Sequence, residues 1–176
     1  MSSRHLGRVR AVDAESFGEP GSRTFRLVVL GEDGAPAATW MEKEQLQALS
    51  LALKQMLEQL DRPDTESAPL PETPPVGEHP KIEFKAGRLG MGYAEEDGTI
   101  VLFVYDIEEP DEEEAALIFH MTADQGASLT HRLDDIIAAG RPICFLCGAS
   151  IDPGGHVCVR SNGHRAQEVP PSSDAD

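Results

Sequence analysis

All three cysteines of the chain and one of its six histidines fall within the segment CFLCGASIDPGGHVC, residues 144–158. Cys144 and Cys147 form a C-x2-C pair, whose thiolates can approach one ion from a tight turn, and Gly148 permits that turn. A second, glycine-rich turn carries His156 and Cys158. Thiolate and imidazole are ligands that zinc prefers, so this spacing predicts a zinc site.

Two histidines are candidates for the fourth ligand of this site. Tetrahedral zinc needs four ligands, and Cys144, Cys147 and Cys158 supply three. We choose His156, because it shares a turn with Cys158, over His164 in the SNGH sequence just beyond. A closed Cys3His shell leaves no position for water, so we expect structural rather than catalytic zinc.

Two other interpretations of the cysteines stay open. A C-x2-C pair can be a redox site, but that use favours a βαβ context with a helix opening at the first cysteine, and neither is evident here. The thiols can also be buried groups that bind nothing. Another chemically suggestive stretch is GEPGSRT, residues 18–24, where Arg23 is a candidate anion-binding residue. Its simpler interpretation is a Pro-Gly turn that leads into a strand.

Composition divides the chain of 176 residues into five parts. Residues 62–80 are rich in proline and predict a linker, and the polar residues 166–176 predict a disordered tail. Outside these two segments we expect a first folded repeat over residues 1–61, a second over residues 81–140, and the zinc knuckle over residues 141–165.

The first block predicts a hairpin and a helix. Residues 24–30 and 37–41 are rich in apolar and β-branched residues, and the intervening GEDG supplies a turn. Residues 42–60 then carry leucine and methionine at helical spacing, which predicts a helix with one apolar face.

The second block repeats this order. Residues 82–93, 99–107 and 115–121 predict three strands, and Thr122 can cap a helix that runs to about residue 139. A shift of eighty positions superposes Met41 on Met121, Gln45 on Gln125 and Leu49 on Leu129. We therefore predict an α+β protein in which a βββα unit occurs twice. The strands are expected to form one antiparallel sheet with two helices on one face. The alternative is a chance agreement of two amphipathic helices.

Net charge and hydropathy limit the classes of partner and the cellular location that we expect. The formal net charge of -16 disfavours a nucleic-acid-binding role, because Lys and Arg supply most of the affinity for phosphate backbones. A small basic face formed by arginines near the cysteines is the exception that this argument leaves open. The chain has no stretch typical of a signal peptide or membrane span, and an odd number of cysteines suits a reducing compartment, so we expect a cytoplasmic protein.

Several quoted stretches also carry a resemblance to a known family. GEPGSRTF, MEKEQ, FKAGRLGMGY and CFLCGASIDPGGHVCVRSNGHR together resemble the uncharacterised bacterial family numbered 3090 among the domains of unknown function, typical of actinobacteria and Chloroflexi. The resemblance covers about residues 6 to 165. In that family proline usually follows the first and last cysteines, where Phe145 and Val159 stand here. The resemblance implies no activity. Members of that family are often encoded near a histidine-phosphatase-like protein, which implies at most a shared pathway.

These observations favour a non-catalytic binding or scaffold module with structural zinc and a protein or small-molecule partner that the sequence does not identify. The alternative is an enzyme that acts on a small phosphorylated or anionic metabolite, with Arg23 in a pocket between the repeats. The sequence does not fix the oligomeric state.

Overall fold

The computed structural model describes residues 3–19, 21–61, 80–139, 144–149, 151 and 155–160. The chain divides into two compact units, Met1–Gly140 and Arg141–Asp176. The predicted linker, apart from Pro80, lies outside the described residues, as do the predicted tail and His164.

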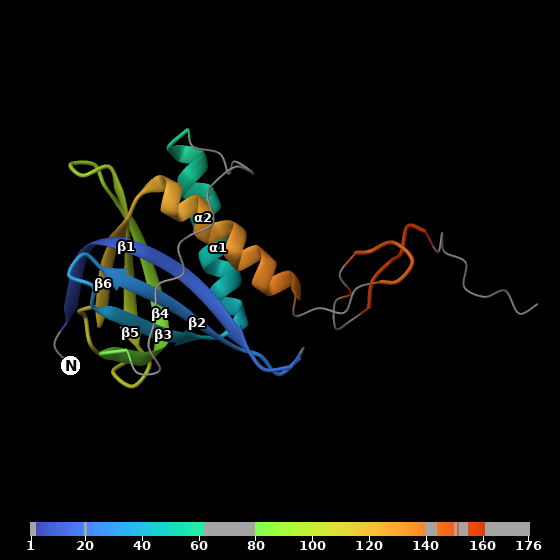
Figure 1. Cartoon of the computed structure of the whole chain (residues 1–176), viewed down its shortest axis with the longest axis horizontal. Coiled ribbons are helices and arrows are strands. Elements are labelled where there is room, and N and C mark those ends of the chain that lie inside the picture. The colour runs from blue at the N-terminus through green and yellow to red at the C-terminus, as the bar shows by residue number, and fades with distance from the viewer. Residues whose placement is uncertain are drawn as a thin grey trace, which may run out of the picture. The chain divides into compact units, whose positions relative to one another are not determined.

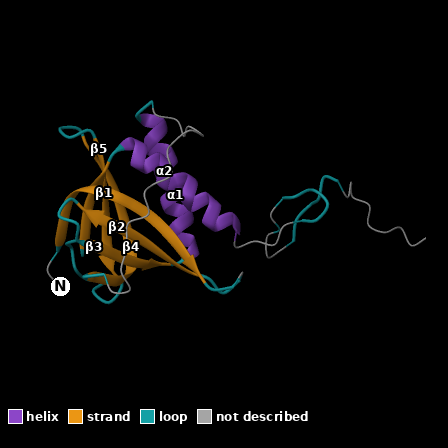
Figure 2. Cartoon of the chain, in the orientation of Figure 1, coloured by secondary structure: helices purple, strands orange, loops and turns teal. Residues whose placement is uncertain are grey.

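The first unit is a mixed α+β structure of six strands and two helices (Figures 1 and 2). In chain order these are β1 (Arg4–Phe17), β2 (Thr24–Gly31), β3 (Pro36–Met41), α1 (Lys43–Gln59), β4 (Ile82–Ala94), β5 (Thr99–Asp106), β6 (Leu117–Met121) and α2 (Ala123–Ala139). The expected helices and the strands on either side of them are therefore present. The βββα pattern implied a strand before residue 24 without bounds, and this strand is β1.

The prediction of one antiparallel sheet is wrong, because the six strands close into a barrel that contains two parallel pairs. β3 pairs with β4 in parallel, and β6 pairs with β1 in parallel, while the other neighbours are antiparallel. The crossover through α1 makes a parallel β3–β4 pair possible. Because successive strands within each block are antiparallel, β3 runs in the same direction as β1, and β6 runs in the same direction as β4. Once β4 is parallel to β3, closure makes β6 parallel to β1.

The core of this unit is continuous from the barrel interior to the helices. Alternate strand residues such as Leu27, Leu102 and Phe119 point inward and are at most 1% exposed. Leu53 of α1 and Leu133 of α2 belong to the same cluster and are fully buried. Burial of each such side chain contributes about 1.5–3 kcal/mol, so the apolar helix faces fix the helices to the barrel.

Both helices lie together on one side of the barrel (Figure 1). They pack against each other, and α2 also contacts β1 and β5 while α1 contacts β4. Ser50 Oγ of α1 donates a hydrogen bond of 2.7 Å to Asp134 of α2, and Lys54 Nζ lies 2.6 Å from the same carboxylate. No helix of the described residues is long and apolar enough to cross a membrane.

A glutamine in the first turn of each helix ties the helix to an irregular point of a neighbouring strand. Gln45 Oε1 accepts the N–H of Glu42, and its Nε2 lies 3.0 Å from Ala86 O and 2.9 Å from Gly87 O of β4. Gln125 Oε1 accepts the N–H of Thr122, and its Nε2 donates to the carbonyls of residues 9 and 10 in β1. The register of the strand pairing shifts at both places. The glutamines therefore satisfy carbonyls that a shifted ladder leaves available.

Candidate metal centre

Four side chains of the C-terminal unit converge on one point. The ligand atoms of Cys144, Cys147, His156 and Cys158 all lie within 4.8 Å of one another. The Sγ atoms of Cys144 and Cys158 are 3.8 Å apart, and Cys147 Sγ is 3.9 Å from His156 Nε2. Around one tetrahedral zinc ion, two sulfurs lie about 3.8 Å apart and a sulfur and a nitrogen about 3.6 Å apart. The four donors therefore lie close enough together to hold a metal ion.

A short turn at residues 144–149 and the segment of residues 155–158 present these donors. In the first, the N–H of Gly148 donates to Cys144 O and the N–H of Cys144 donates to Ala149 O, both at 2.8 Å. Gly148 has a φ of 73° and Gly155 a φ of 90°, values that residues with a Cβ rarely adopt. These glycines let the chain turn tightly enough for the thiols and the imidazole to face each other.

The surroundings of Cys147 raise its pKa above the usual value for a thiol. A backbone hydrogen bond from Ala149 lowers this pKa, but desolvation and the neighbouring thiols of Cys158 and Cys144 together outweigh it. Crowded thiols retain their protons because adjacent thiolates repel one another. A bound cation reverses this effect, since a thiol that coordinates a metal is deprotonated.

The geometry does not have the features of a thioredoxin-like redox pair. None of the three cysteines forms a disulfide bond, and the 3.8 Å between the Cys144 and Cys158 sulfurs is well beyond the roughly 2.05 Å of such a bond. Cys144 and Cys147 lie in a turn, and none of the described residues of the C-terminal unit is helical. Donor chemistry and geometry both favour coordination.

Sequence reasoning missed the apolar side chains that alternate with the ligands. Phe145 is 93% exposed, Val157 92% and Val159 80%, and Leu146 is also exposed. The C-F-L-C and H-V-C-V order was the available signal, because residues between the ligands of a tight turn must point away from the ion.

The structure places Arg23, the predicted anion-binding residue, between β1 and β2. It follows a turn closed by the N–H of Ser22 and Glu19 O at 2.9 Å, with Gly21 at a φ of 94°. Its Nε is buried and has no hydrogen-bond partner within the described part of the chain. A cavity of about 130 Å³ in the same unit lies elsewhere, and Arg23 is not among its lining residues, which are Gly87, Arg88, Tyr105, Asp106, Ile107 and Pro110. The structure therefore does not join Arg23 to that cavity.

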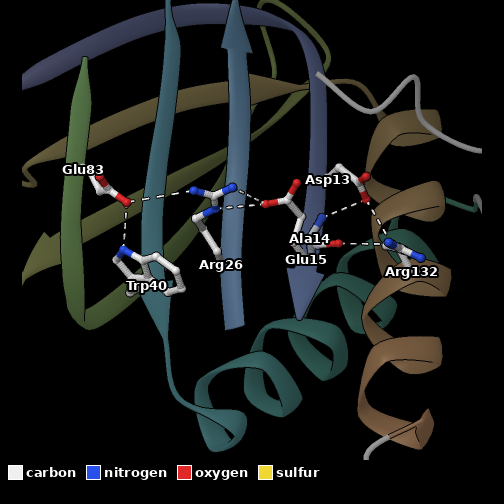
Figure 3. A network of polar contacts seen from close by, with 7 residues as sticks. All are labelled: Asp13, Ala14, Glu15, Arg26, Trp40, Glu83 and Arg132. Carbon is white, nitrogen blue, oxygen red and sulfur yellow. Dashed lines mark hydrogen bonds and ion pairs between the residues drawn. The ribbon is translucent and has the colours of Figure 1, made fainter. Parts of the chain in front are cut away.

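A polar network that the sequence did not indicate crosses the outer face of β1, β2, β3 and β4 (Figure 3). Arg26 Nε and Nη2 donate to Glu15 Oε2 at 2.9 and 2.6 Å. The guanidinium carbon lies 5.1 Å from the ring centroid of Phe17 and 5.4 Å from that of Trp40. Trp40 Nε1 in turn donates to Glu83 at 2.9 Å. Arg26 is thus paired with two carboxylates, Glu15 at 2.6 Å and Glu83 at 4.0 Å, so its charge is already engaged within the network.

Comparison with known proteins identifies a family but no activity. No curated protein and no solved structure matches the chain. The sequence model of one family, described as "Protein of unknown function (DUF3090)", matches residues 5–158. The matched region contains the barrel from the second residue of β1 onward with its two helices, and it ends at Cys158, the last of the four clustered ligands. A match over that share of the chain shows that this protein belongs to the family of unknown function numbered 3090.

Proposed function

We propose that this is a cytoplasmic zinc-binding protein and that it acts as a non-catalytic binding or scaffold module. The observation that carries the proposal is the convergence of four metal-ligand atoms within 4.8 Å in the C-terminal unit. Cys144, Cys147, His156 and Cys158 hold one structural Zn²⁺ ion in this proposal.

The donor set supports zinc in a structural role. Three thiolates and one imidazole are a set that tetrahedral zinc takes, whereas magnesium and calcium prefer oxygen. Four protein ligands fill the shell, so no water is activated at the ion. The ion would replace a hydrophobic core in this short unit, since metal binding supplies folding free energy directly.

The side chains between the ligands support a binding role. Phe145, Val157 and Val159 are each at least 80% exposed within a few residues of the ligands. Large exposed apolar side chains that lie close together in the sequence are candidates for an interaction surface. The barrel interior supports the same conclusion, because large core side chains such as Leu102 and Phe119 fill it.

We also propose that the first unit arose by duplication of a βββα unit. Two observations support this. Gln45 and Gln125, which the shift of eighty positions superposes, make corresponding hydrogen bonds to the residue that precedes their helix and to a neighbouring strand. Lys54 and Asp134, superposed by the same shift, contact each other between α1 and α2 at 2.6 Å, as residues near a local two-fold axis would.

The first test is the metal content of the full chain purified without chelator, by elemental analysis. We expect about one zinc ion per chain, and the Cys144→Ser and Cys158→Ser variants should lose it. His156→Asn should also lose zinc, whereas the matched His164→Asn should keep it. In ¹⁵N NMR spectra, signals of residues 144–160 should collapse toward random-coil positions on zinc loss. A zinc-free wild-type chain, or zinc retained by both cysteine variants, would overturn the site.

The binding role is tested separately with Phe145→Ser/Val157→Ser. This double variant should retain its zinc because neither residue is a ligand. Proteins cross-linked to the wild-type chain in cells should be lost from the variant, and mass spectrometry measures both samples. The matched control is Leu51→Ser, which changes another exposed apolar residue on α1. Equal cross-linking in all three chains would contradict a binding role for the knuckle surface.

A further inference from the structure

Two histidines from opposite ends of the barrel sequence face each other across the seam where the barrel closes. His5 of β1 and His120 of β6 have their Nε2 atoms 3.1 Å apart, with ring centroids 5.2 Å apart. The strand register explains the meeting. His5 lies opposite Ile118 and Arg8 opposite His120, so β1 has one extra residue between the two pairs. Gly7 has a φ of 65° in this bulge, and a bulge redirects neighbouring side chains.

The second nitrogen of His120 is fixed from behind. Its Nδ1 lies 3.0 Å from Oγ1 of Thr99, a β5 residue that is only 1% exposed. This hydrogen bond holds the ring with Nε2 directed at His5. Metal-bound histidines are oriented in the same way, by a hydrogen bond at the nitrogen that does not bind the metal.

The separation of the two nitrogens suits one shared ion. Two imidazoles bound at about 2.0–2.1 Å to one ion have nitrogens about 2.9 Å apart at a right angle and about 3.4 Å apart at the tetrahedral angle. The observed 3.1 Å falls between these values and is also the length of an N–H···N hydrogen bond between the two rings, which a shared ion would replace. His5 is exposed and His120 partly exposed, so an ion reaches them without opening the core.

The charges around the pair permit a cation. Arg8, which lies opposite His120 in the strand pairing, donates to Asp97 O at 2.9 Å and lies 3.9 Å from the Asp97 carboxylate, which offsets its charge. The chain as a whole carries a formal charge of -16. The net charge of the chain therefore favours the approach of a divalent cation.

From this geometry we infer that His5 and His120 form an open binding site for a divalent transition metal, oriented by Thr99. Imidazole pairs suit Cu²⁺, Ni²⁺ and Zn²⁺, and Cu²⁺ binds most tightly. Two protein ligands leave the remaining coordination positions to water or to a ligand from outside the chain. The site uses none of the residues of the Cys144–Cys158 cluster and does not depend on its metal.

The test uses Ni²⁺ as the probe on the full chain purified with zinc present. Paramagnetic Ni²⁺, added below one equivalent, should broaden the imidazole NMR signals of His5 and His120 first and leave His131 of α2 sharp. Calorimetry should give a Kd for Ni²⁺ that is at least about tenfold higher in His5→Asn, because this variant loses one of the two ligands. The Kd should be unchanged in the matched His131→Asn. Thr99→Val should weaken binding by a smaller factor, because it frees the His120 ring without removing a ligand.

Two results would overturn the inference. One is broadening that starts at His156 or His164, which would place the added ion at the C-terminal cluster. The other is an affinity for Ni²⁺ in His5→Asn equal to that of the wild-type chain. His5 is exposed on the first strand, so this variant tests the site even if His120→Asn proves unstable.

Discussion

Single residues at the helix starts do more for this fold than their partial exposure suggests. Gln45 satisfies one orphan N–H at the start of α1 and two carbonyls of β4 with a single side chain. Apolar periodicity identified the helix, but it held no information about this role. The one sequence signal was the recurrence of glutamine at position 125, eighty residues later. A repeated polar residue inside an apolar pattern therefore indicates a structural hydrogen bond.

Replacing Gln45 by alanine should lower the free energy of unfolding by about 2 kcal/mol, because three hydrogen bonds are lost and the Ala86 carbonyl loses a partner in a part-buried place. Urea unfolding followed by circular dichroism measures the change. Gln125→Ala should cost about as much. The control Gln47→Ala alters an exposed glutamine of the same helix and should change stability little. Equal stability of Gln45→Ala and Gln47→Ala would refute the role.

The residues of the two proposed metal sites differ in how readily the sequence indicates them. Cys144, Cys147, His156 and Cys158 lie within one short segment, where spacing alone predicts that they meet. His5 and His120 are 115 positions apart and meet only because the barrel closes. No local pattern links two such residues, since their contact depends on the register of a parallel pair and on a bulge.

At the scale of elements, hairpins and helices were predictable and the joins between them were not. The strand of residues 24–30, the GEDG turn and the return strand appear as β2 and β3 nearly as expected. Hairpin pairing is set by a short turn, so local sequence specifies it. The β3–β4 and β6–β1 pairs join strands separated by a helix or by nearly the whole unit. Their direction follows from the topology of all six strands, which no single segment encodes.

The outer face of the barrel gives a prediction at this scale. Arg26 joins β1 to β2 through two hydrogen bonds to Glu15, and its guanidinium lies against two adjacent aromatic rings. Arg26→Lys keeps the charge but loses the planar group, so unfolding free energy should fall by about 1–2 kcal/mol. Arg10→Lys, an exposed position of β1, is the control and should have almost no effect. Denaturant titration distinguishes the two variants, and equal stability would contradict the stacking argument.

At the scale of the whole molecule, the apolar core that stabilises the barrel and the proposed zinc ligands belong to different units. The barrel with its helices has a continuous core of its own, and the clustered ligands all lie after residue 140. A chain that ends at Gly140 should therefore fold, with the thermal midpoint of the full chain and without cysteine-bound zinc. Calorimetry and elemental analysis test this expectation. A large fall in the midpoint on truncation would show that the barrel needs the second unit.

Closure of the barrel has a consequence for the order in which the chain can fold. The seam between β1 and β6 joins Arg4 to Leu117, so it forms only after almost all of the first unit has been synthesised. Until then β1 keeps a row of unpaired N–H and C=O groups, which can pair with the edge of another chain. Contacts so distant in sequence also form slowly. The newly made chain is therefore most prone to aggregate just before β6 is available, and seam formation ends that exposure.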